Sequence, residues 1–575
     1  MKCFHLLFSL LVLLQVATTL RPIHAHSSQV NNTNRIRCLE KERQALLDIK
    51  GELVDIHGRL SSWGNEENKR DCCKWEGVHC HNRSNHVTQL NLAFYQLQGK
   101  ISTSLLELKH LRYLDFSEND FKYAPIPEFI GSFTKLRYLR LSNSNFSGPI
   151  PRQIGNMISL EYLDLSKNGL EGGIPKHFGN LSSLVNLYMN ENNLTGDLHE
   201  LILSLSGPTE KKLEKLDLSM NTISGFFPNM SRFSSLLTLG LHENKLSGPL
   251  GEDNLRLPNL TYLDLSFNLI TGPVPDLSIS SSLEYLCMSN NRLNGTLTQS
   301  IGRLSQLLEL DFSINEFLEV QFSHRWAPDF LLEYLDLRVC KLGNNFPTWL
   351  KTQTELQYID ISGTGISDTI PGELPTSMSN CTSLEMIDVG DNRLTGKIPD
   401  WIGNSFSEFL NFLDLSRNRL SGSIPNSLCD LSHLGVLDLS YNNLSGRIPQ
   451  NNQGLTFKES AFEGNIGLCG LPLNKSCPGD KSHQGPNSRV ARTNVGEEFE
   501  DDRFITDGFY ISMGLGFIVG FWGIFGTILL NKTFRYAFFG RWDTIYDLVL
   551  VRIELSKARF GVVSRTGDLD NAEKC

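Results

Sequence analysis

Apolar residues return along most of this chain with a spacing longer than that of one helix or one strand. In LNFLDLSRNRLSGSIP, residues 410–425, leucines stand at the first, fourth, sixth and eleventh positions. The template LxxLxLxxNxLxGxIP recurs about every 24 residues between Val87 and Pro449. One such unit cannot bury its apolar face alone, so neighbouring units are expected to stack into a solenoid.

About fifteen units fill residues 87–449. They begin at Val87, Leu111, Leu136, Leu160, Leu184, Leu213, Leu236, Leu260, Leu283, Leu307, Leu332, Leu356, Leu384, Leu410 and Leu434. Each LxL pair predicts a short strand, and strands stacked about 4.8 Å apart predict a long parallel sheet. We expect this α/β solenoid to carry the curved sheet on its concave face, with 3-10 turns and loops on the convex face. The longer steps after Leu184 and Leu356 predict loops that leave the stack intact.

A polar residue follows each predicted strand, where the chain must bend. A side-chain amide at this position can bond backbone groups that the bend leaves unpaired. The asparagines of this column are Asn119, Asn168, Asn192, Asn221, Asn244, Asn268, Asn291, Asn315, Asn392, Asn418 and Asn442. Ser144, Cys340 and Thr364 replace asparagine in three units, and we expect them to make part of the same set of bonds.

The chain before the repeats divides into two segments. A basic start followed by an apolar run indicates a secretory signal peptide over residues 1–25. Residues 26–86 predict a cap, because leucines at helical spacing over 39–54 precede a cysteine-rich stretch. Spacing alone leaves the disulfide connectivity open; we expect Cys38 to pair with Cys72 and Cys73 with Cys80. Such a cap would cover the open apolar end of the first repeat.

The chain after the repeats contains several segments of different composition. Residues 450–480 contain Cys469 and Cys477, and residues 481–508 form a polar linker that ends in an acidic patch. Residues 509–530 carry no charge and would span about 33 Å as a helix, which is enough to cross a bilayer. Basic residues follow directly, so the tail, 531–575, is expected in the cytosol.

Charge and cysteine content limit the partners and the cellular compartment that the chain can have. The chain has 53 basic and 63 acidic residues, for a formal net charge of −10, and no basic stripe. Nucleic acid is therefore a poor candidate partner. Flanking cysteine pairs suit disulfides in an oxidising compartment, whereas Cys287, Cys340, Cys381 and Cys429 lie inside repeats and are interpreted as small buried hydrophobes.

Enzyme signatures are missing from the sequence. HExxH, GxSxG and kinase motifs do not occur, and apart from the cap cysteines no His and Cys residues have metal-ligand spacing. We therefore expect no enzyme activity, cofactor or metal. Carboxylates do recur between the strand leucines, and their period makes them part of the fold template. They are Asp115, Asp164, Asp217, Asp264, Asp311, Asp336, Asp360, Asp388, Asp414 and Asp438.

Recognition is expected from exposed positions that depart from the template. Alternation along the strand places the variable residues on the concave side. Tyrosines recur before the second leucine, at Tyr113, Tyr138, Tyr162, Tyr262, Tyr285, Tyr334 and Tyr358. In the column before the turn asparagine, exposed apolar side chains suggest a binding patch, which Arg338 adjoins in place of the usual serine. The candidate ligand-binding residues are Met220, Phe267, Ile314, Arg338 and Val339.

Eleven Asn-x-Ser/Thr sequons precede the predicted span and are expected to be glycosylated in the secretory route. They are Asn31, Asn82, Asn145, Asn180, Asn193, Asn229, Asn259, Asn294, Asn380, Asn443 and Asn474. Asn531 has the same motif and is expected to stay bare, because it would face the cytosol.

The repeats, with tails such as GPIP at 148–151 and GRIP at 446–449, resemble plant-specific leucine-rich repeats. CCKWEGVHC resembles the N-terminal cap of plant repeat receptors, and FEGNIGLCGLPLNKSC is similar to their C-terminal cap, which implies a Cys469–Cys477 bond. Residues 509–560 closely resemble the C-terminal region of receptor-like proteins related to the ethylene-inducing xylanase receptors.

The resemblance implies a single-pass type I plasma-membrane receptor without a kinase. It implies a role in plant defence, with an extracellular protein or peptide ligand, an adaptor receptor-like kinase bound through the span, and a co-receptor kinase recruited by ligand. Gly516 and Gly520 form a small-xxx-small pair that suits the adaptor contact. Tyr546 and Val549 fit the family's endocytic pattern.

Two features depart from the family. Its members usually carry more repeats and a non-repeat island a few repeats before the end, whereas here the last repeats run on. Three other interpretations therefore stay open: a receptor for a developmental peptide, a truncated non-signalling decoy, and an extracellular enzyme-inhibitor-like binding module. The predicted span argues against the last, because such inhibitors are secreted.

Overall fold

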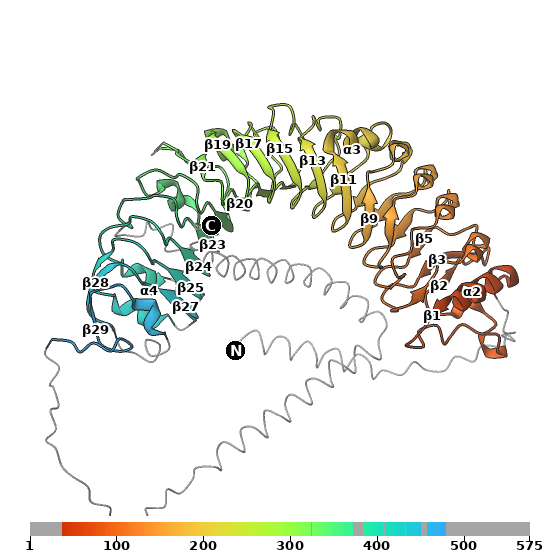
Figure 1. Ribbon diagram of the computed structural model, residues 1–575, viewed down its shortest axis with the longest axis horizontal. Coiled ribbons are helices and arrows are strands. Elements are labelled where there is room, and N and C mark those ends of the chain that lie inside the picture. The colour runs from red at the N-terminus through yellow and green to blue at the C-terminus, as the bar shows by residue number, and fades with distance from the viewer. Residues whose placement is uncertain are drawn as a thin grey trace, which may run out of the picture. The chain divides into compact units, whose positions relative to one another are not determined.

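The computed structural model describes residues 37–323, 325–371, 383–405, 409–431, 433–449 and 457–478. Its repeat strands follow an arc and line the inner side (Figure 1). The signal peptide, the linker, the predicted membrane span and the tail lie outside these residues. Among the residues described, no helix is long and apolar enough to cross a membrane.

The N-terminal cap is built around helix α2 (Glu40–Glu52), as the leucine spacing predicts. Ala45, Leu46 and Ile49 are buried against the first repeat. Beyond α2, the ring of the buried Trp63 stacks on that of Trp75 with 5.4 Å between centroids. The other cap elements are β1 (Leu53–Val54), which pairs with β4 (Gln98–Gly99), η1 (Glu67–Lys69), η2 (Cys72–Lys74) and β2 (Val78–Cys80).

Three disulfides close the two caps, with the pairings expected from the sequence. Cys38–Cys72 and Cys73–Cys80 lie in the N-terminal cap, and Cys469–Cys477 lies in the C-terminal cap. Cys287 and Cys340 are free and buried, which agrees with their interpretation as small core residues. Cys381 lies outside the described residues.

A sixteen-stranded sheet forms the concave face in the described part of the chain. Its first strand, β2, pairs antiparallel with β3, and the strands from β3 onward are parallel. After β2 they are β3 (Val87–Asn91), β5 (Tyr113–Asp115), β6 (Tyr138–Arg140), β8 (Tyr162–Asp164), β10 (Asn186–Tyr188), β12 (Lys215–Asp217), β14 (Thr238–Gly240), β16 (Tyr262–Asp264), β18 (Tyr285–Cys287), β20 (Glu309–Asp311), β22 (Tyr334–Asp336), β23 (Tyr358–Asp360), β24 (Met386–Asp388), β25 (Phe412–Asp414) and β27 (Val436–Asp438).

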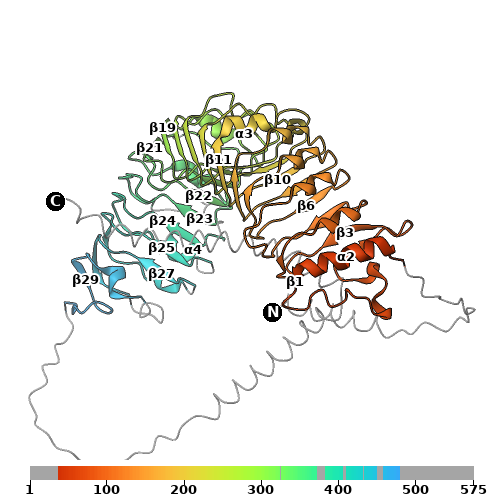
Figure 2. The ribbon, with the colours of Figure 1, turned by 45° about the vertical axis from the view of Figure 1, so that its right-hand side comes forward.

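The template leucines form one continuous core behind this sheet. In the repeat that starts at Leu260, Leu263 and Leu265 are fully buried. Because each unit shares its apolar side chains with the next, the array needs no single large core. The two longer steps do not break the stack: β10 pairs directly with β12, and β23 with β24. Residues added in the first step form helix α3 (Leu198–Ser204) on the convex side (Figures 1 and 2).

At every bend where they occur, the side chains of the turn asparagines form hydrogen bonds with backbone groups that the bend leaves without a backbone partner. Asn268 Nδ2 donates to the carbonyls of Leu241, Leu265 and Ser266 at 3.0–3.1 Å, and its Oδ1 accepts from Leu246 N at 2.9 Å. One side chain thus joins two successive repeats through four bonds. Of the substitutes, Ser144 keeps two such bonds to carbonyls and Cys340 keeps one weaker bond, from its Sγ to Phe312 O at 3.1 Å.

A second parallel sheet lies beyond the turns, where only 3-10 turns and loops were expected (Figure 1). The LSGxIP segment extends after the asparagine, and its glycine, for example Gly272 at φ +83°, turns the chain while neighbouring backbones still pair. The strands are β7 (Ser147–Pro149), β9 (Gly169–Gly172), β11 (Asn193–Asp197), β13 (Thr222–Phe226), β15 (Lys245–Pro249), β17 (Leu269–Gly272), β19 (Arg292–Thr296) and β21 (Phe317–Glu319).

Short helices and a terminal sheet complete the array. The convex side carries the expected 3-10 helices η3 (Thr103–Glu107), η4 (Glu128–Ser132), η5 (Arg152–Asn156), η6 (Lys176–Asn180), η7 (Thr209–Lys211), η8 (Gln299–Arg303), η9 (Thr348–Thr352) and η11 (Asn426–Asp430), with helix α4 (Trp401–Ser405). Strands β26 (Ser421–Gly422), β28 (Asn443–Arg447) and β29 (Gly467–Cys469) pair in parallel, and η12 (Glu459–Phe462) packs against β27.

Candidate functional site

The recurring aspartates are held as part of the fold. Asp264 Oδ1 accepts bonds from Ser266 N at 2.9 Å and from Ser266 Oγ at 2.6 Å, and the residue is 6% exposed. Asp115 bonds Ser117 in the same way. Each carboxylate therefore closes a local turn after its strand and presents little acceptor capacity to solvent.

Tyrosines cover these aspartates on the concave face and stack between strands. Tyr113, Tyr138 and Tyr162 form one row, with ring centroids 4.4 Å and 4.2 Å apart. Tyr262 with Tyr285, and Tyr334 with Tyr358, form two further pairs at 4.2 Å. Burial raises the pKa of Tyr113, Tyr162 and Tyr262. The rows offer rigid, neutral, half-buried rings for contact.

Tyr188 lengthens the first row in a way that the repeat pattern did not indicate. It stands opposite Asp164 in the sheet register, at the position that aspartate occupies in most repeats. Its ring nevertheless reaches that of Tyr162, with 5.5 Å between centroids. Burial raises the pKa of Tyr188 to about 12. Only the inter-strand register shows that this side chain joins the row.

The apolar candidates stand at the exposed bend after the strands. Met220, Phe267, Ile314 and Val339 are between 38% and 42% exposed, as the sequence pattern predicts. All four have positive φ, from +52° to +64°. The bend requires this positive φ, because the backbone N–H of each residue bonds a carbonyl of the next repeat. For example, Val339 N donates to Ser362 O at 2.9 Å.

Ile314 and Val339 combine exposure with backbone strain. They follow adjacent strands, β20 and β22, and have φ of +53° and +64°. A left-handed conformation costs an L-residue about 1–2 kcal/mol, and branching at Cβ makes it rarer still. Asn143 and Asn290 occupy the same column at +48° and +51°. This column before the turn asparagine thus accepts asparagine, which adopts positive φ more readily. Ile314 and Val339 instead expose apolar surface there, at a cost in folding free energy.

Arg338 is held by acids of its own sheet. Its Nε lies 3.5 Å from Asp336 Oδ2, and its Nη1 lies 3.7 Å from Asp360 Oδ2. The side chain is 29% exposed. The two carboxylates raise the pKa of the Arg338 guanidinium against the opposing effect of burial. Arg338 therefore supports the strands beside Val339 and exposes only part of its charge to the concave side.

A row of acids follows from β20 to β25 on this face. Burial, with Asp360 and Asp414 next in effect, raises the pKa of Asp388 to about 8. Burial also raises the pKa of Asp311, Asp336 and Asp414. Arg338 is the basic side chain that the described structure pairs with two members of this row. The apolar bend residues Ile314 and Val339 therefore lie on the same face as a row of buried carboxyls, several of which have raised pKa values.

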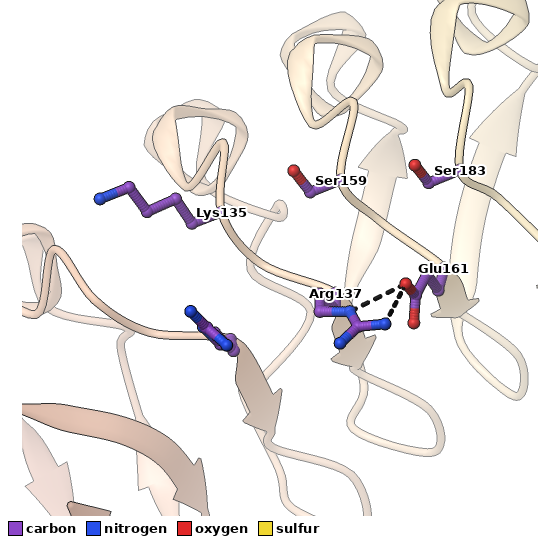
Figure 3. Close-up of a pocket in the computed structure, with 6 residues that line it drawn as sticks. Lys135, Arg137, Ser159, Glu161 and Ser183 are labelled. Atoms are coloured by element: carbon purple, nitrogen blue, oxygen red, sulfur yellow. Dashed lines mark hydrogen bonds and ion pairs between the residues drawn. The ribbon is translucent and has the colours of Figure 1, made fainter. Parts of the chain in front are cut away.

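A shallow pocket of about 340 Å³ lies at the edge where the chain enters strands of the first repeats (Figure 3). Arg137 donates two bonds to Glu161 Oε1, one of them 2.8 Å from Nε. Arg112 and Lys135 add two positive charges that Glu161 does not neutralise. The pocket suits an acidic group, although its residues followed no pattern that sequence reasoning singled out. The lining residues are Arg112, Lys135, Arg137, Ser159, Glu161 and Ser183.

The sequence search did not single out one group of possible metal ligands that the fold brings together in the described residues. Glu42, His86 and His110 bring one donor atom each to within 4.8 Å of one another. The repeat pattern could have indicated the two histidines, because His86 and His110 occupy the same position in adjacent repeats, directly before the first core residue. The sulfurs of Cys38, Cys72 and Cys73 also cluster, but all three are in disulfides.

The nine described sequon asparagines are exposed, and none lies in a strand of the sixteen-stranded sheet. Asn193, Asn294 and Asn443 lie instead on β11, β19 and β28. Glycans at these positions would leave the concave face open. The remaining candidates lie outside the described residues: Asn31, Asn380, Gly516, Gly520, Tyr546 and Val549.

Family models match three parts of the chain. The leucine rich repeat N-terminal domain matches residues 39–81, and a leucine-rich repeat region matches residues 90–216. The single leucine rich repeat matches residues 259–278, 282–304, 383–405, 409–431 and 433–455. These matches cover the N-terminal cap and repeats at both ends of the array.

Curated relatives are similar over a limited part of the chain. The receptor-like proteins EIX1 and EIX2 of Solanum lycopersicum are 48% identical over 128 and 126 residues. Each match covers 20% of this chain and 12% of the relative. Receptor-like protein 7 of Arabidopsis thaliana is 38% identical over 113 residues, which is 19% of this chain and 11% of the relative.

Solved structures share the solenoid. The ectodomain of the Arabidopsis thaliana receptor kinase GASSHO1/SCHENGEN3, in complex with CASPARIAN STRIP INTEGRITY FACTOR 2, superposes with a TM-score of 0.52 at 28% identity. The match covers 66% of this chain and 50% of the other. A TDR receptor has the same TM-score at 24% identity, over 65% of this chain and 76% of its own, and shows the fold alone. The chain therefore contains leucine-rich repeats with their N-terminal domain, and over part of its length it is similar to plant receptor-like proteins of the EIX1 and EIX2 group.

Proposed function

We propose that this protein is a kinase-lacking receptor at the plant cell surface that binds an extracellular protein or peptide of microbial origin on its concave face. The observation that carries the proposal is the pair Ile314 and Val339, exposed apolar residues held at positive φ on the sixteen-stranded sheet. Strained, exposed apolar groups on a rigid surface are typical of binding sites. Exposure of the sequons outside this sheet supports the same face.

The membrane arrangement belongs to this proposal. Residues 1–25 would direct export, residues 509–530 would anchor the chain as a type I protein, and residues 531–575 would form the cytosolic tail. Similarity to EIX1 and EIX2 supports it. In this proposal, signalling uses an adaptor receptor-like kinase that contacts Gly516 and Gly520, and a co-receptor kinase recruited by ligand. Co-immunoprecipitation of a plasma-membrane kinase that is lost on Gly516→Leu with Gly520→Leu would support the adaptor contact.

The binding face can be tested without disturbing the fold. In the double variant Ile314→Asn with Val339→Asn, each new residue matches Asn290 in the same column, so the variant should fold and gain about 1 kcal/mol per site from relieved strain. We expect the full chain on plant cells to capture a protein from microbial culture filtrates, and the variant to capture at least about tenfold less. Pull-down of biotinylated filtrate proteins measures both.

Lys167→Asn is the matched control, because Lys167 has φ +55° in the same column but lies six repeats away from Ile314. It should capture as much filtrate protein as the unchanged chain. If the double variant captured as much filtrate protein as the unchanged chain, Ile314 and Val339 would not belong to the binding face.

One observation favours a second candidate. The GASSHO1/SCHENGEN3 ectodomain, similar in fold, is solved with CASPARIAN STRIP INTEGRITY FACTOR 2. A developmental role would place a plant peptide on the same face. Capture from sterile plant apoplastic fluid, and none from microbial filtrate, would select this candidate. No capture from either source would favour a non-signalling decoy.

A further inference from the structure

Three side chains from separate parts of the chain meet where the cap joins the repeats. Glu42 lies on α2, His86 directly precedes β3, and His110 directly precedes the repeat that starts at Leu111. One donor atom from each lies within 4.8 Å of the other two. From this junction we infer that Glu42, His86 and His110 form a binding site for a divalent transition-metal ion, with Zn²⁺ as the best match. This inference does not depend on the proposed ligand.

The carboxylate is already oriented. Glu42 is 4% exposed, its Oε2 accepts the backbone N–H of Val87 at 2.8 Å, and its Oε1 lies 2.8 Å from His86 Nδ1. A buried carboxylate costs free energy unless it is paired, and this one has a backbone donor on one oxygen and an imidazole on the other. Backbone bonds of this kind fix ligand orientation at metal sites.

The third ligand is unused. His110 Nδ1 is buried and has no hydrogen-bond partner in the described structure. A buried ring nitrogen without a partner calls for an explanation, and a bound ion supplies one. The His110 ring stacks on that of His86 with centroids 3.7 Å apart and planes 20° apart. An ion shared by both rings therefore needs one ring to turn, and no bond at Nδ1 holds His110 in place.

The ligand set selects the metal. Two imidazoles and one carboxylate form a three-residue zinc site in which the fourth position takes water, with Zn–N distances of about 2.0–2.1 Å. The donors of such a site lie roughly 3.3 Å apart, so donors within 4.8 Å of one another need only small movements. Hard ions such as Ca²⁺ prefer six or more oxygens, which this cluster does not offer.

Two nearby charges oppose a cation. Lys135 and Arg112 act electrostatically on His110, and both are exposed. We therefore expect weaker binding than at a four-residue structural site. Their presence also provides a specific variant: Lys135→Met removes one positive charge without touching a ligand, and should tighten binding.

A bound ion would join α2 to two successive repeats. The cap shields the open end of the core, so an ion that binds only the folded junction raises its melting temperature by mass action. With excess Zn²⁺ we expect the first unfolding transition to rise by at least about 2 °C.

The test uses the purified full chain in detergent, stripped with EDTA and titrated with ZnCl₂ by calorimetry. One equivalent should bind, and His110→Phe should lose it, because phenylalanine keeps the ring stack but offers no nitrogen. His79→Ala is the matched control: His79 is exposed on β2, outside the cluster. Lys135→Met should bind at least about threefold more tightly.

Cobalt gives a readout that needs no variant. Co²⁺ bound to the unchanged chain should give a four- or five-coordinate visible spectrum that Zn²⁺ displaces. Two results would overturn the inference: no saturable Zn²⁺ or Co²⁺ binding by the unchanged chain, or equal Zn²⁺ stoichiometry in folded His110→Phe and the unchanged chain.

Discussion

At the scale of single residues, polar side chains bond the backbone wherever the repeat bends. Asn119, Asn268 and Asn418 each donate to three carbonyls, and each oxygen accepts one N–H from the preceding repeat. These groups are buried, so each bond lost leaves a carbonyl or N–H without water. The asparagine column is therefore a large share of what holds one repeat to the next.

Asn268→Ala tests this role. The change leaves three carbonyls and the Leu246 N–H with fewer bonds in a buried bend, and we expect the free energy of unfolding to fall by about 2–4 kcal/mol. Urea denaturation followed by circular dichroism measures it. Asn186→Ala is the control: Asn186 lies on β10 and its side chain makes none of these bonds. A loss below about 0.5 kcal/mol for Asn268→Ala would show that water replaces the amide.

At the scale of elements, the strands from β20 to β25 carry a row of aspartates. Folding raises the pKa of members of this row, so the folded chain binds protons that the unfolded chain releases. Burial and the neighbouring acids raise the pKa of Asp388 from its ordinary value of 3.8 to about 8. Between these values the folded chain holds a proton that the unfolded chain has released. The free energy of unfolding therefore falls as pH rises across this window, by at most about 1.4 kcal/mol per pH unit.

Asp388→Asn should remove this dependence. Asparagine keeps the acceptor for Gly390 N, now 2.9 Å from Asp388 Oδ1, and cannot ionise. We expect the free energy of unfolding of the unchanged chain to fall relative to that of the variant between pH 5 and pH 8, as measured by urea denaturation at both values. Asp391→Asn changes an exposed acid and should leave the pH dependence as it is. An unchanged slope in Asp388→Asn would show that this carboxyl is ionised throughout.

At the scale of the whole molecule, the array is not reinforced evenly. From β7 to β21 a second sheet runs beside the concave sheet. Between β21 and β26, the described chain has isolated bridges in this row, Glu319–Lys341 and Thr369–Thr395, and single backbone bonds such as Ser367 N to Asn344 O at 2.9 Å. Among the described residues, the repeats that contain β22, β23 and β24 thus have no strand in the second sheet. Val339 lies in the first of these repeats, and Ile314 lies in the repeat before it.

Amide hydrogen exchange should show this difference. In a solenoid, opening is local because each repeat contacts only its neighbours. We expect the amides of β22–β24 to exchange at least about tenfold faster than those of β12–β18, as measured by mass spectrometry of peptic peptides. Uniform protection across both regions would mean that the second sheet adds little to local stability.

Much of this fold could be predicted from the sequence because its contacts have a fixed period. The leucines predicted the strands, and Asn268 and its equivalents predicted the bends. The exposed state of Val339 also followed from its place in the repeat. Other features could not be predicted, because they depend on which residues of neighbouring repeats face one another. Arg338 looked available to a ligand, whereas Asp336 and Asp360 hold it.

What the sequence by itself determined is the solenoid, since a repeated unit that cannot bury its own leucines must stack. Local patterns also carried the family resemblance, which implied the Cys469–Cys477 bond, whereas spacing left the connectivity of the N-terminal cap open until the structure paired Cys38 with Cys72 and Cys73 with Cys80. Only the tertiary structure decided that a second sheet forms, that Tyr188 joins the tyrosine row, and that Glu42 meets two histidines 44 and 68 positions further along the chain. The reason is physical: a period determines the contacts within a repeat and between equivalent positions, whereas contacts between non-equivalent positions depend on inter-strand register and on how the cap docks.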